Sequence, residues 1–133
     1  MTSPSHLPVV AIGMVEHDDG RVLICRRPVS DDDRSRWELP AVVLRPDESP
    51  EAAMRRGAKQ CVDLAVSVTS GQPPFRDQFD GRMSIYRFFV CHREEGDARA
   101  LDPFDEIRWI QPGKLIEYDY DPPTQSIVNW FLE

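Results

Sequence analysis

The sequence lacks any long apolar run: nothing in its 133 residues approaches the roughly 18 consecutive apolar residues that a membrane-spanning helix needs. The segment from Met1 to Pro8 also lacks the basic patch followed by an apolar stretch that marks a secretory leader. These absences predict a protein without a membrane partner that resides in the cytoplasm.

Cysteines are few, and their spacing is uninformative about metals or cross-links. Cys25, Cys61 and Cys91 are odd in number, far apart, and form no Cys-x-x-Cys pair. Neither a disulfide framework nor a zinc knuckle is therefore indicated. We expect three buried thiols, because free cysteine behaves as a small apolar side chain.

Cations are outnumbered, with 16 Lys and Arg against 23 Asp and Glu and a net charge of −7. This balance disfavours nonspecific binding to a nucleic-acid backbone, which depends on clustered cations that release counterions. Small nucleotides and proteins remain possible partners. The length fits one domain over residues 1–133, with a sizeable core.

Runs of β-branched residues separated by turn residues predict most of the strands. Pro8–Val15, the turn at Asp18-Asp-Gly20 and Arg21–Arg26 predict a β-hairpin. Further strands are predicted over 41–44, 64–69, 82–91 and 107–110, with a loop over 70–78 and a last helix over 124–132. Strands and helices mix without strict alternation, which favours an α+β fold.

The clearest helix start lies in the middle of the chain. Ser49 is a typical N-cap, Pro50 occupies the first helical position, and Glu51 lies beside the positive end of the helix dipole. The apolar spacing then predicts a helix from Pro50 to about Val62, with a buried stripe of Ala53, Met54, Ala58, Cys61 and Val62.

The segment around this helix resembles the signature of Nudix hydrolases of the MutT type. Trp37-Glu-Leu-Pro40 and Pro46-Asp-Glu-Ser-Pro-Glu-Ala-Ala53 look like the family's signature region. The family pattern is Gly, five residues, Glu, seven residues, then Arg-Glu-apolar-any-Glu-Glu-any-Gly-apolar. Its spacing holds without a gap, with the first glycine on Val42, the first glutamate on Glu48, the arginine on Arg56 and the last apolar residue on Leu64.

The resemblance extends over nearly the whole chain, through Arg26-Arg27-Pro28, Glu106-Ile-Arg-Trp109 and the segment that starts at Pro122. It implies a Nudix fold, an α/β/α sandwich with a mixed β-sheet and the signature loop and helix. It also implies pyrophosphohydrolase activity of the 8-oxo-dGTP or CTP type, with Mg²⁺ or Mn²⁺ as cofactor.

The chemistry of the signature helix departs from this pattern. The resemblance implies metal-binding glutamates at positions 57, 60 and 61, whose spacing brings them to one helix face, but these positions are Gly57, Gln60 and Cys61. Glycine offers no ligand, and a thiol is a soft donor poorly matched to magnesium. Asp63, like Val42, replaces a family glycine. We therefore expect the usual metal-dependent hydrolysis to be lost or much weakened, and we expect no metal.

Two charged residues of the signature are retained, Glu48 and Arg56. The resemblance implies a structural salt bridge for Arg56, and Glu48 lies at the N-terminus of the helix, where a structural role suffices. The alternative is an active pyrophosphohydrolase of nucleoside diphosphate derivatives. It would use substitute metal ligands, for which Glu48, Glu51 and Glu106 are the candidates.

Ligand binding rests on two further positions. The resemblance implies that Arg27 and Gln125 occupy places where MutT-like proteins hold the base, and a glutamine amide offers both a donor and an acceptor. We therefore expect binding of a nucleotide or nucleoside-diphosphate-linked ligand, or of a protein partner. A homodimer is also possible. The sequence also resembles the Nudix-like C-terminal domain of adenine glycosylases, which helps to recognise damaged DNA, but the net charge of −7 ranks this reading last.

Overall fold

The computed structural model describes residues 7–28, 36–79 and 81–133. In these ranges the chain forms β1 (Val9–Glu16), β2 (Val22–Arg26), β3 (Trp37–Glu38), β4 (Ala41–Val43), α1 (Pro50–Val62), β5 (Ala65–Gly71), β6 (Phe75–Phe79), β7 (Arg82–Glu95), β8 (Glu106–Ile110), the 3₁₀ helix η1 (Pro112–Glu117) and α2 (Pro122–Phe131). The 8 strands in these ranges belong to one sheet, whose main path is β3-β2-β1-β7-β5. Strands β4, β8 and β6 pair with β1, β2 and β7.

Strand β1 lies at the centre and makes the sheet mixed. It runs parallel to β7, from the pair Val9 and Ile85 to the pair Glu16 and His92. It pairs antiparallel with β2, which confirms the predicted hairpin, and with β4. The expected α+β class with a mixed sheet is therefore confirmed.

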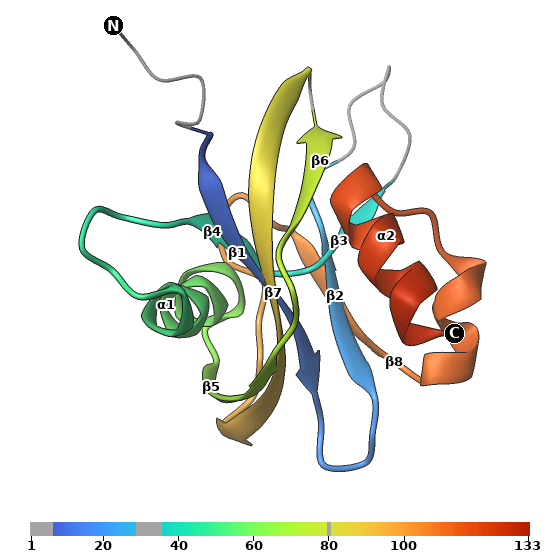
Figure 1. Ribbon diagram of the computed structural model, residues 1–133. Helices are drawn as coiled ribbons and strands as arrows, with labels where there is room; N and C mark the ends of the chain where they lie inside the picture. Colours follow the sequence, from blue (N-terminus) through green and yellow to red (C-terminus); the bar gives the residue numbers. More distant parts are fainter. Residues whose placement is uncertain (1–6, 29–35, 80) are drawn as a thin grey trace, which may run out of the picture.

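The two long helices cover opposite faces of the sheet (Figure 1). Successive residues of β1 point to alternate faces, so Ala11 and Val15 belong to the core under α1, whereas Ile12 and Met14 belong to the core under α2. Gly13 lets α1 approach closely, because a Cβ there would lie 2.6 Å from the sulfur of Met54. This arrangement is the expected α/β/α sandwich.

Helix α1 has the predicted bounds and caps. Ser49 has extended backbone angles, and its Oγ accepts a hydrogen bond of 3.1 Å from the backbone N–H of Ala52. The helix ends at Asp63, which takes the left-handed conformation with φ of 53°. Its backbone N–H donates to the carbonyls of Ala58 and Lys59, as a residue after a helix end does in this conformation.

The predicted loop over 70–78 is wrong in its second half. Strand β6 starts at Phe75 and pairs with the beginning of β7, where the rings of Phe75 and Tyr86 stack 5.3 Å apart. Strand β7 also continues to Glu95, beyond the predicted end at Cys91, because β5 pairs with its second half. The polar run Arg76-Asp-Gln78 does not predict a strand from the sequence. This segment is extended because it pairs with the neighbouring β7.

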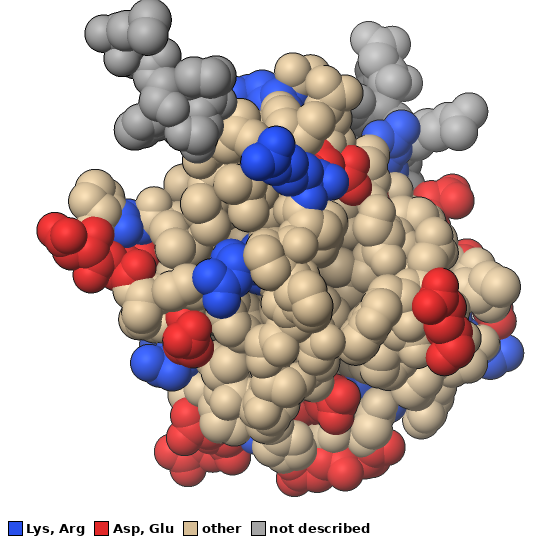
Figure 2. All heavy atoms as spheres, in the orientation of Figure 1, with Lys and Arg blue, Asp and Glu red and all other residues tan. Residues whose placement is uncertain are grey.

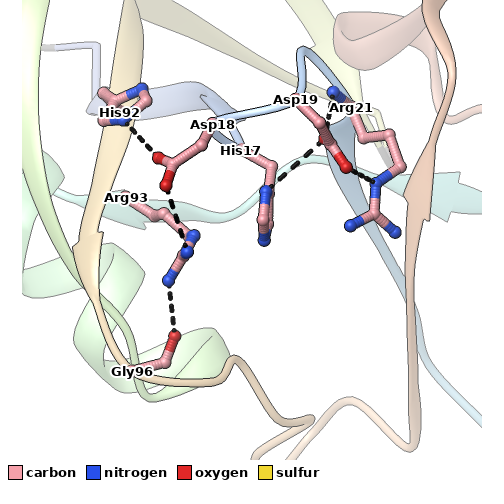
Figure 3. A network of polar contacts seen from close by, with 7 residues as sticks. All are labelled: His17, Asp18, Asp19, Arg21, His92, Arg93 and Gly96. Atoms are coloured by element: carbon pink, nitrogen blue, oxygen red, sulfur yellow. Dashed lines mark hydrogen bonds and ion pairs between the residues drawn. The ribbon is translucent and has the colours of Figure 1, made fainter.

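A polar network holds this extension of β7 against the turn between β1 and β2 (Figure 3). Nε2 of His92 lies 2.8 Å from Oδ1 of Asp18, and Arg93 donates to Oδ2 of the same carboxylate over 3.4 Å. Arg93 also donates to the carbonyl of Gly96 over 3.0 Å. The network therefore joins segments that are far apart in the sequence.

Helix α2 begins at Pro122, two residues before its predicted start, because Asp121 caps it by accepting from the backbone N–H of Thr124 over 3.0 Å. No helix in the described part of the chain is both long and apolar enough to cross a membrane.

Candidate functional site

Glu48 and Arg56 form the central ion pair of the signature loop. Nε and Nη2 of Arg56 donate to the two carboxylate oxygens of Glu48 over 2.9 and 2.8 Å. Arg56 also donates to the carbonyl of Val43, and Glu48 accepts from the backbone N–H of Arg45 over 3.1 Å. The Arg56 guanidinium is the main cause that lowers the pKa of Glu48 to about 2. Both side chains therefore tie the loop to α1.

Position 57 of the signature helix is packed against strand β4. Gly57 is buried, and a Cβ at this position would lie 3.1 and 3.2 Å from the two methyl carbons of Val42. Valine therefore fills the space into which a side chain at position 57 would extend. Both residues depart from the family pattern, and the two departures are in direct contact.

The other two positions of the helix face are also occupied by contacts within the protein. The side-chain oxygen of Gln60 accepts a hydrogen bond of 3.1 Å from Arg56. The buried thiol of Cys61 lies 3.7 Å from the carbonyl of Ala41, and burial raises its pKa. Because a hard divalent cation requires several oxygen ligands, the residues present on this face do not fit one.

Asp63 reproduces the geometry of the glycine that it replaces. Its positive φ is one that aspartate adopts more readily than most residues, and its carboxylate lies 3.3 Å from Lys59 and 2.9 Å from Arg99. The end of the signature helix therefore keeps a glycine-like backbone without glycine.

The three candidate substitute ligands do not converge. Glu51 lines a surface cavity with Thr69 and Arg87, whereas Glu48 is bound by Arg56. Glu106 forms ion pairs with Arg26 and Arg108. No group of three His, Cys, Asp or Glu side chains within residues 7–28, 36–79 and 81–133 is placed to hold a metal ion. The geometry thus argues against the proposed substitute set.

Trp37 of the signature region packs in the core beneath α2. It is 5% exposed, and the guanidinium groups of Arg26 and Arg108 lie 5.1 and 5.0 Å from its ring. The ring of Tyr118 packs edge-on against it at 5.7 Å. Glu106 forms ion pairs with both arginines and so holds their guanidinium groups beside the Trp37 ring.

A cavity of about 460 Å³ opens between β4, the beginning of β7 and the start of α2, and we call it the Arg27 cavity. It is lined by Pro8, Val10, Ile12, Arg27, Glu38, Leu39, Ala41, Val42, Val43, Arg82, Ser84, Tyr86, Asp121 and Pro123. Its walls are mostly apolar, with a few polar groups that converge, as is typical of small-molecule sites.

Four charged side chains, Arg27, Glu38, Arg82 and Asp121, line the Arg27 cavity. Arg27 donates to both carboxylate oxygens of Glu38, over 3.0 and 3.3 Å, and lies 5.3 Å above the ring of Phe104. Burial raises the pKa of Glu38 and also that of Asp121, whose charge acts on Glu38. Two carboxyl groups with restricted access to water therefore face one cavity, where perturbed acids often mark a functional site.

The structure brings Arg27 to this cavity but not Gln125. Gln125 lines another cavity with Tyr118 and Tyr120, and its amide donates to Asn129 over 2.9 Å. Thr124 and Ile127 face the core instead, which turns Gln125 outward. Sequence reasoning thus missed Glu38 and Asp121 as lining groups, although the Asp-Pro-Pro start of the last helix was a recognisable N-cap signal.

The arrangement of fold, signature loop and helix defines a Nudix domain. A profile of the NUDIX domain family matches residues 6–131. The chain therefore belongs to the Nudix family.

Two relatives narrow the comparison to MutT-like members. A MutT-like protein of Streptomyces ambofaciens is 29% identical over 116 residues, which cover 87% of this chain and 71% of that protein. The nucleoside triphosphatase NudI of Escherichia coli O81 is 28% identical over 127 residues, which cover 84% of this chain and 88% of that protein.

Solved structures agree on the fold. The E. coli ORF135 protein superposes with a TM-score of 0.75 at 22% identity, covering 95% of this chain and 89% of that one. The MutT protein from Methanosarcina mazei Go1 superposes with a TM-score of 0.76 at 16% identity, covering 96% and 93%.

Proposed function

We propose that this chain binds a nucleotide-like ligand in the Arg27 cavity and has lost the usual metal-dependent hydrolysis of its family. The observation that carries the proposal is the contact between Val42 and Gly57, because position 57 bears no carboxylate and apolar side-chain atoms crowd the place of its Cβ. Gln60 and Cys61 replace the other two metal-binding carboxylates and bond to Arg56 and Ala41.

The chemistry of pyrophosphate hydrolysis makes this replacement decisive. A cation must neutralise the charge that develops on the leaving phosphate, and it must orient or activate the attacking water. On α1 the charged side chain that contacts this face is Arg56, which donates to Gln60 and is paired with Glu48. The face therefore offers no carboxylate of its own that would recruit a divalent cation.

Binding is supported by the composition of the Arg27 cavity. Glu38 and Asp121 offer carboxyl oxygens that accept hydrogen bonds from N–H groups of a nucleobase, and Arg27 offers a flat guanidinium face. The relatives named MutT-like protein and nucleoside triphosphatase favour a ligand of the nucleotide class.

A turnover screen tests the proposal. The protein is incubated with Mg²⁺ or Mn²⁺ and a panel of nucleoside triphosphates and nucleoside diphosphate derivatives, and the released nucleoside monophosphate is measured. We expect no release above that of a Glu48→Gln variant prepared in parallel. Release that Glu48→Gln abolishes would show that the chain is a working hydrolase.

Residual hydrolysis with substitute ligands is the second candidate, favoured by the name of the NudI relative. It requires carboxylates such as Glu48, Glu51 and Glu106 to bind metal when the nucleotide is present. Calorimetric titration of Mn²⁺ in the presence of a non-hydrolysable nucleotide decides between the two. The relevant heat is the excess over a titration of Mn²⁺ into the nucleotide without protein. Excess heat that disappears in both Glu48→Gln and Glu106→Gln supports this candidate, whereas the absence of excess heat removes it.

A protein partner, including a second copy of the chain, remains an option for the face over β6, β7 and α2. The middle of this face carries few charged residues (Figure 2). Trp130 is 45% exposed there and borders a cavity of about 480 Å³ with Phe75 and Phe88. Sedimentation over a range of concentrations, with Trp130→Ser as comparison, shows whether this face supports self-association.

A further inference from the structure

We propose that a second cavity, between the start of α1, β5 and β7, binds a small zwitterion, a molecule that carries one carboxylate and one ammonium group as an amino acid does. We call it the Arg87 cavity, and its volume is about 510 Å³. It is lined by Glu51, Val68, Thr69, Ser70, Gly71, Gln72, Pro73, Arg87 and Phe89. None of these residues lines the Arg27 cavity, so the two sites are separate.

Arg87 and Glu51 face this cavity with opposite charges but do not pair. In the described part of the chain, neither side chain forms an ion pair, with the other or with a third residue. The partly buried Arg26 and Arg56 are, by contrast, both bound to carboxylates. A cation and an anion that share one cavity without pairing leave both charges available to a ligand.

Arg87 is held by packing rather than by a carboxylate. The residue is partly buried, and the carbon of its guanidinium lies 6.0 Å from the centre of the buried Phe89 ring. Its Nε is buried and has no hydrogen-bond partner among the described residues. A buried N–H group without a partner costs free energy. A guanidinium matches the two oxygens of a carboxylate, which is the group that Arg87 lacks here.

An irregularity of β5 shapes the wall beside Arg87. The register of β5 on β7 shifts between Val68 and Ser70, and the hydroxyl of the intervening Thr69 donates to the carbonyl of Val90 over 2.8 Å. Gly71 leaves the next part of the wall without a side chain, because a Cβ there would lie 3.2 Å from the Phe89 ring. Bulges and glycines in strands are common where a ligand approaches the backbone.

The charges of the cavity favour one class of ligand. A simple anion is attracted by Arg87 and repelled by Glu51, and a simple cation meets the reverse. A molecule with both groups satisfies both residues, since a guanidinium only donates hydrogen bonds and an ionised carboxylate only accepts them. The complementary arrangement therefore has the ligand carboxylate on Arg87 and the ligand ammonium group on Glu51.

Titrations followed by the NMR shifts of backbone amides test this proposal. The zwitterionic probes are glycine, β-alanine, 4-aminobutyrate and 6-aminohexanoate, which carry the two groups at increasing separation. Butyrate and butylammonium are the probes with one charged group. At constant ionic strength, we expect one zwitterion to shift the amides of residues 69–72 with a Kd at least about tenfold below those of both single-charge probes. Equal Kd values for the zwitterions and butyrate, or no shifts at these amides, would overturn the proposal.

Two isosteric variants assign the two ends of the ligand. Arg87→Gln should raise the Kd of the best zwitterion about tenfold, by removal of the partner of its carboxylate. Glu51→Gln should also raise this Kd, but it should lower the Kd of butyrate, because a repulsive charge is removed. If Glu51→Gln instead tightens the binding of the zwitterion, the cavity is a plain anion site and the proposal fails.

Arg55→Gln is the matched control. It removes the same charge one helical turn from Glu51, but Arg55 does not line the cavity. Because salt screens charges that are not in contact, we expect the Kd to stay within about twofold of that of the unmodified chain. An effect as large as that of Arg87→Gln would mean that the general field of α1, rather than contact with Arg87, attracts the ligand, and would overturn the assignment. Circular dichroism verifies that all three variants fold.

Discussion

Val42 and Gly57 are packed against each other, with the methyl carbons of Val42 at 3.1 and 3.2 Å from the position of a Cβ on residue 57. The family pattern has a small residue at the first position and a large acidic one at the second. This chain has the reverse. The space available to the pair is therefore filled from the strand side instead of the helix side, which closes the cavity towards α1.

The coupling between these two residues is measurable by a double-mutant cycle. Gly57→Ala gains roughly 1 kcal/mol of helix propensity but crowds Val42, which offsets the gain. In a Val42→Ala background the crowding is relieved, so we expect Gly57→Ala to be more favourable there by about 1 kcal/mol. Urea unfolding of the four proteins gives the coupling.

Gly113→Ala serves as the control for this cycle, because a Cβ at Gly113 meets nothing within 4 Å. Its effect should add to that of Val42→Ala within about 0.5 kcal/mol. Additivity of Val42→Ala with Gly57→Ala as well would mean that the two positions do not share space.

Glu48 should contribute to stability with a characteristic dependence on pH. Arg56 is the main cause that lowers its folded pKa to about 2, below its ordinary value of 4.5. Its contribution is therefore complete above pH 4.5 and is lost as pH falls towards 2. We expect the Tm difference between the unmodified chain and Glu48→Gln to be largest near neutral pH and to shrink below pH 4.5. A difference that stays constant down to pH 3 contradicts the ion pair.

Asp121 should show the opposite sign. Burial raises its folded pKa above 3.8, so the cost of its charge is absent below that pH and grows as pH rises through the folded pKa. Asp121→Asn should therefore gain stability relative to the unmodified chain as pH increases from 3.8. Thermal unfolding over a pH series checks this trend.

Asp63→Asn is the matched control for Asp121→Asn. Arg99 is the main cause that lowers the pKa of Asp63, followed by Lys59, and asparagine also tolerates the left-handed conformation. This variant should lose stability relative to the unmodified chain as pH rises through the lowered folded pKa to 3.8, and the difference should stay constant above 3.8. Parallel trends for the two variants would contradict the assigned burial of Asp121.

Restoring carboxylates alone should not restore a metal site. The triple substitution Gly57→Glu, Gln60→Glu and Cys61→Glu leaves Val42 in place, so the side chain at position 57 must displace the methyl carbons of Val42. We expect Mn²⁺ binding by calorimetry only after Val42→Gly is added. Comparable binding by the triple and quadruple variants would show that Val42 is no barrier. Circular dichroism of both verifies that they fold.

The frame of the site was predictable from local signals. Ser49 and Pro50 marked the start of α1, and the family resemblance implied a structural salt bridge for Arg56, whose partner in the structure is Glu48. Such signals act within a few residues or follow a fixed motif, so a single sequence contains them. The substitutions at Gly57 and Cys61 were visible for the same reason.

The cavity was harder to predict, because long-range packing decides which side chains line it. Gln125 and Asp121 both belong to the first turns of α2, yet only Asp121 faces the Arg27 cavity. The orientation of α2 on the sheet decides which of the two side chains faces the cavity. This orientation is fixed by the buried Thr124, whose hydroxyl oxygen accepts a hydrogen bond from the backbone N–H of Leu39. For Val42, the sequence shows only that a family glycine is replaced. Its contact with Gly57 depends on how β4 packs against α1.

The most direct test of the central claim is electron paramagnetic resonance of Mn²⁺ titrated with the unmodified chain. Free Mn²⁺ gives a strong signal that decreases when the ion is bound. Because α1 presents no carboxylate at positions 57, 60 and 61, we predict that the protein does not lower the signal. Without nucleotide the reference is Mn²⁺ alone, and with nucleotide it is Mn²⁺ with the same nucleotide and no protein. A stoichiometric loss of signal that Glu48→Gln reverses would contradict the claim that this Nudix domain has lost its metal site.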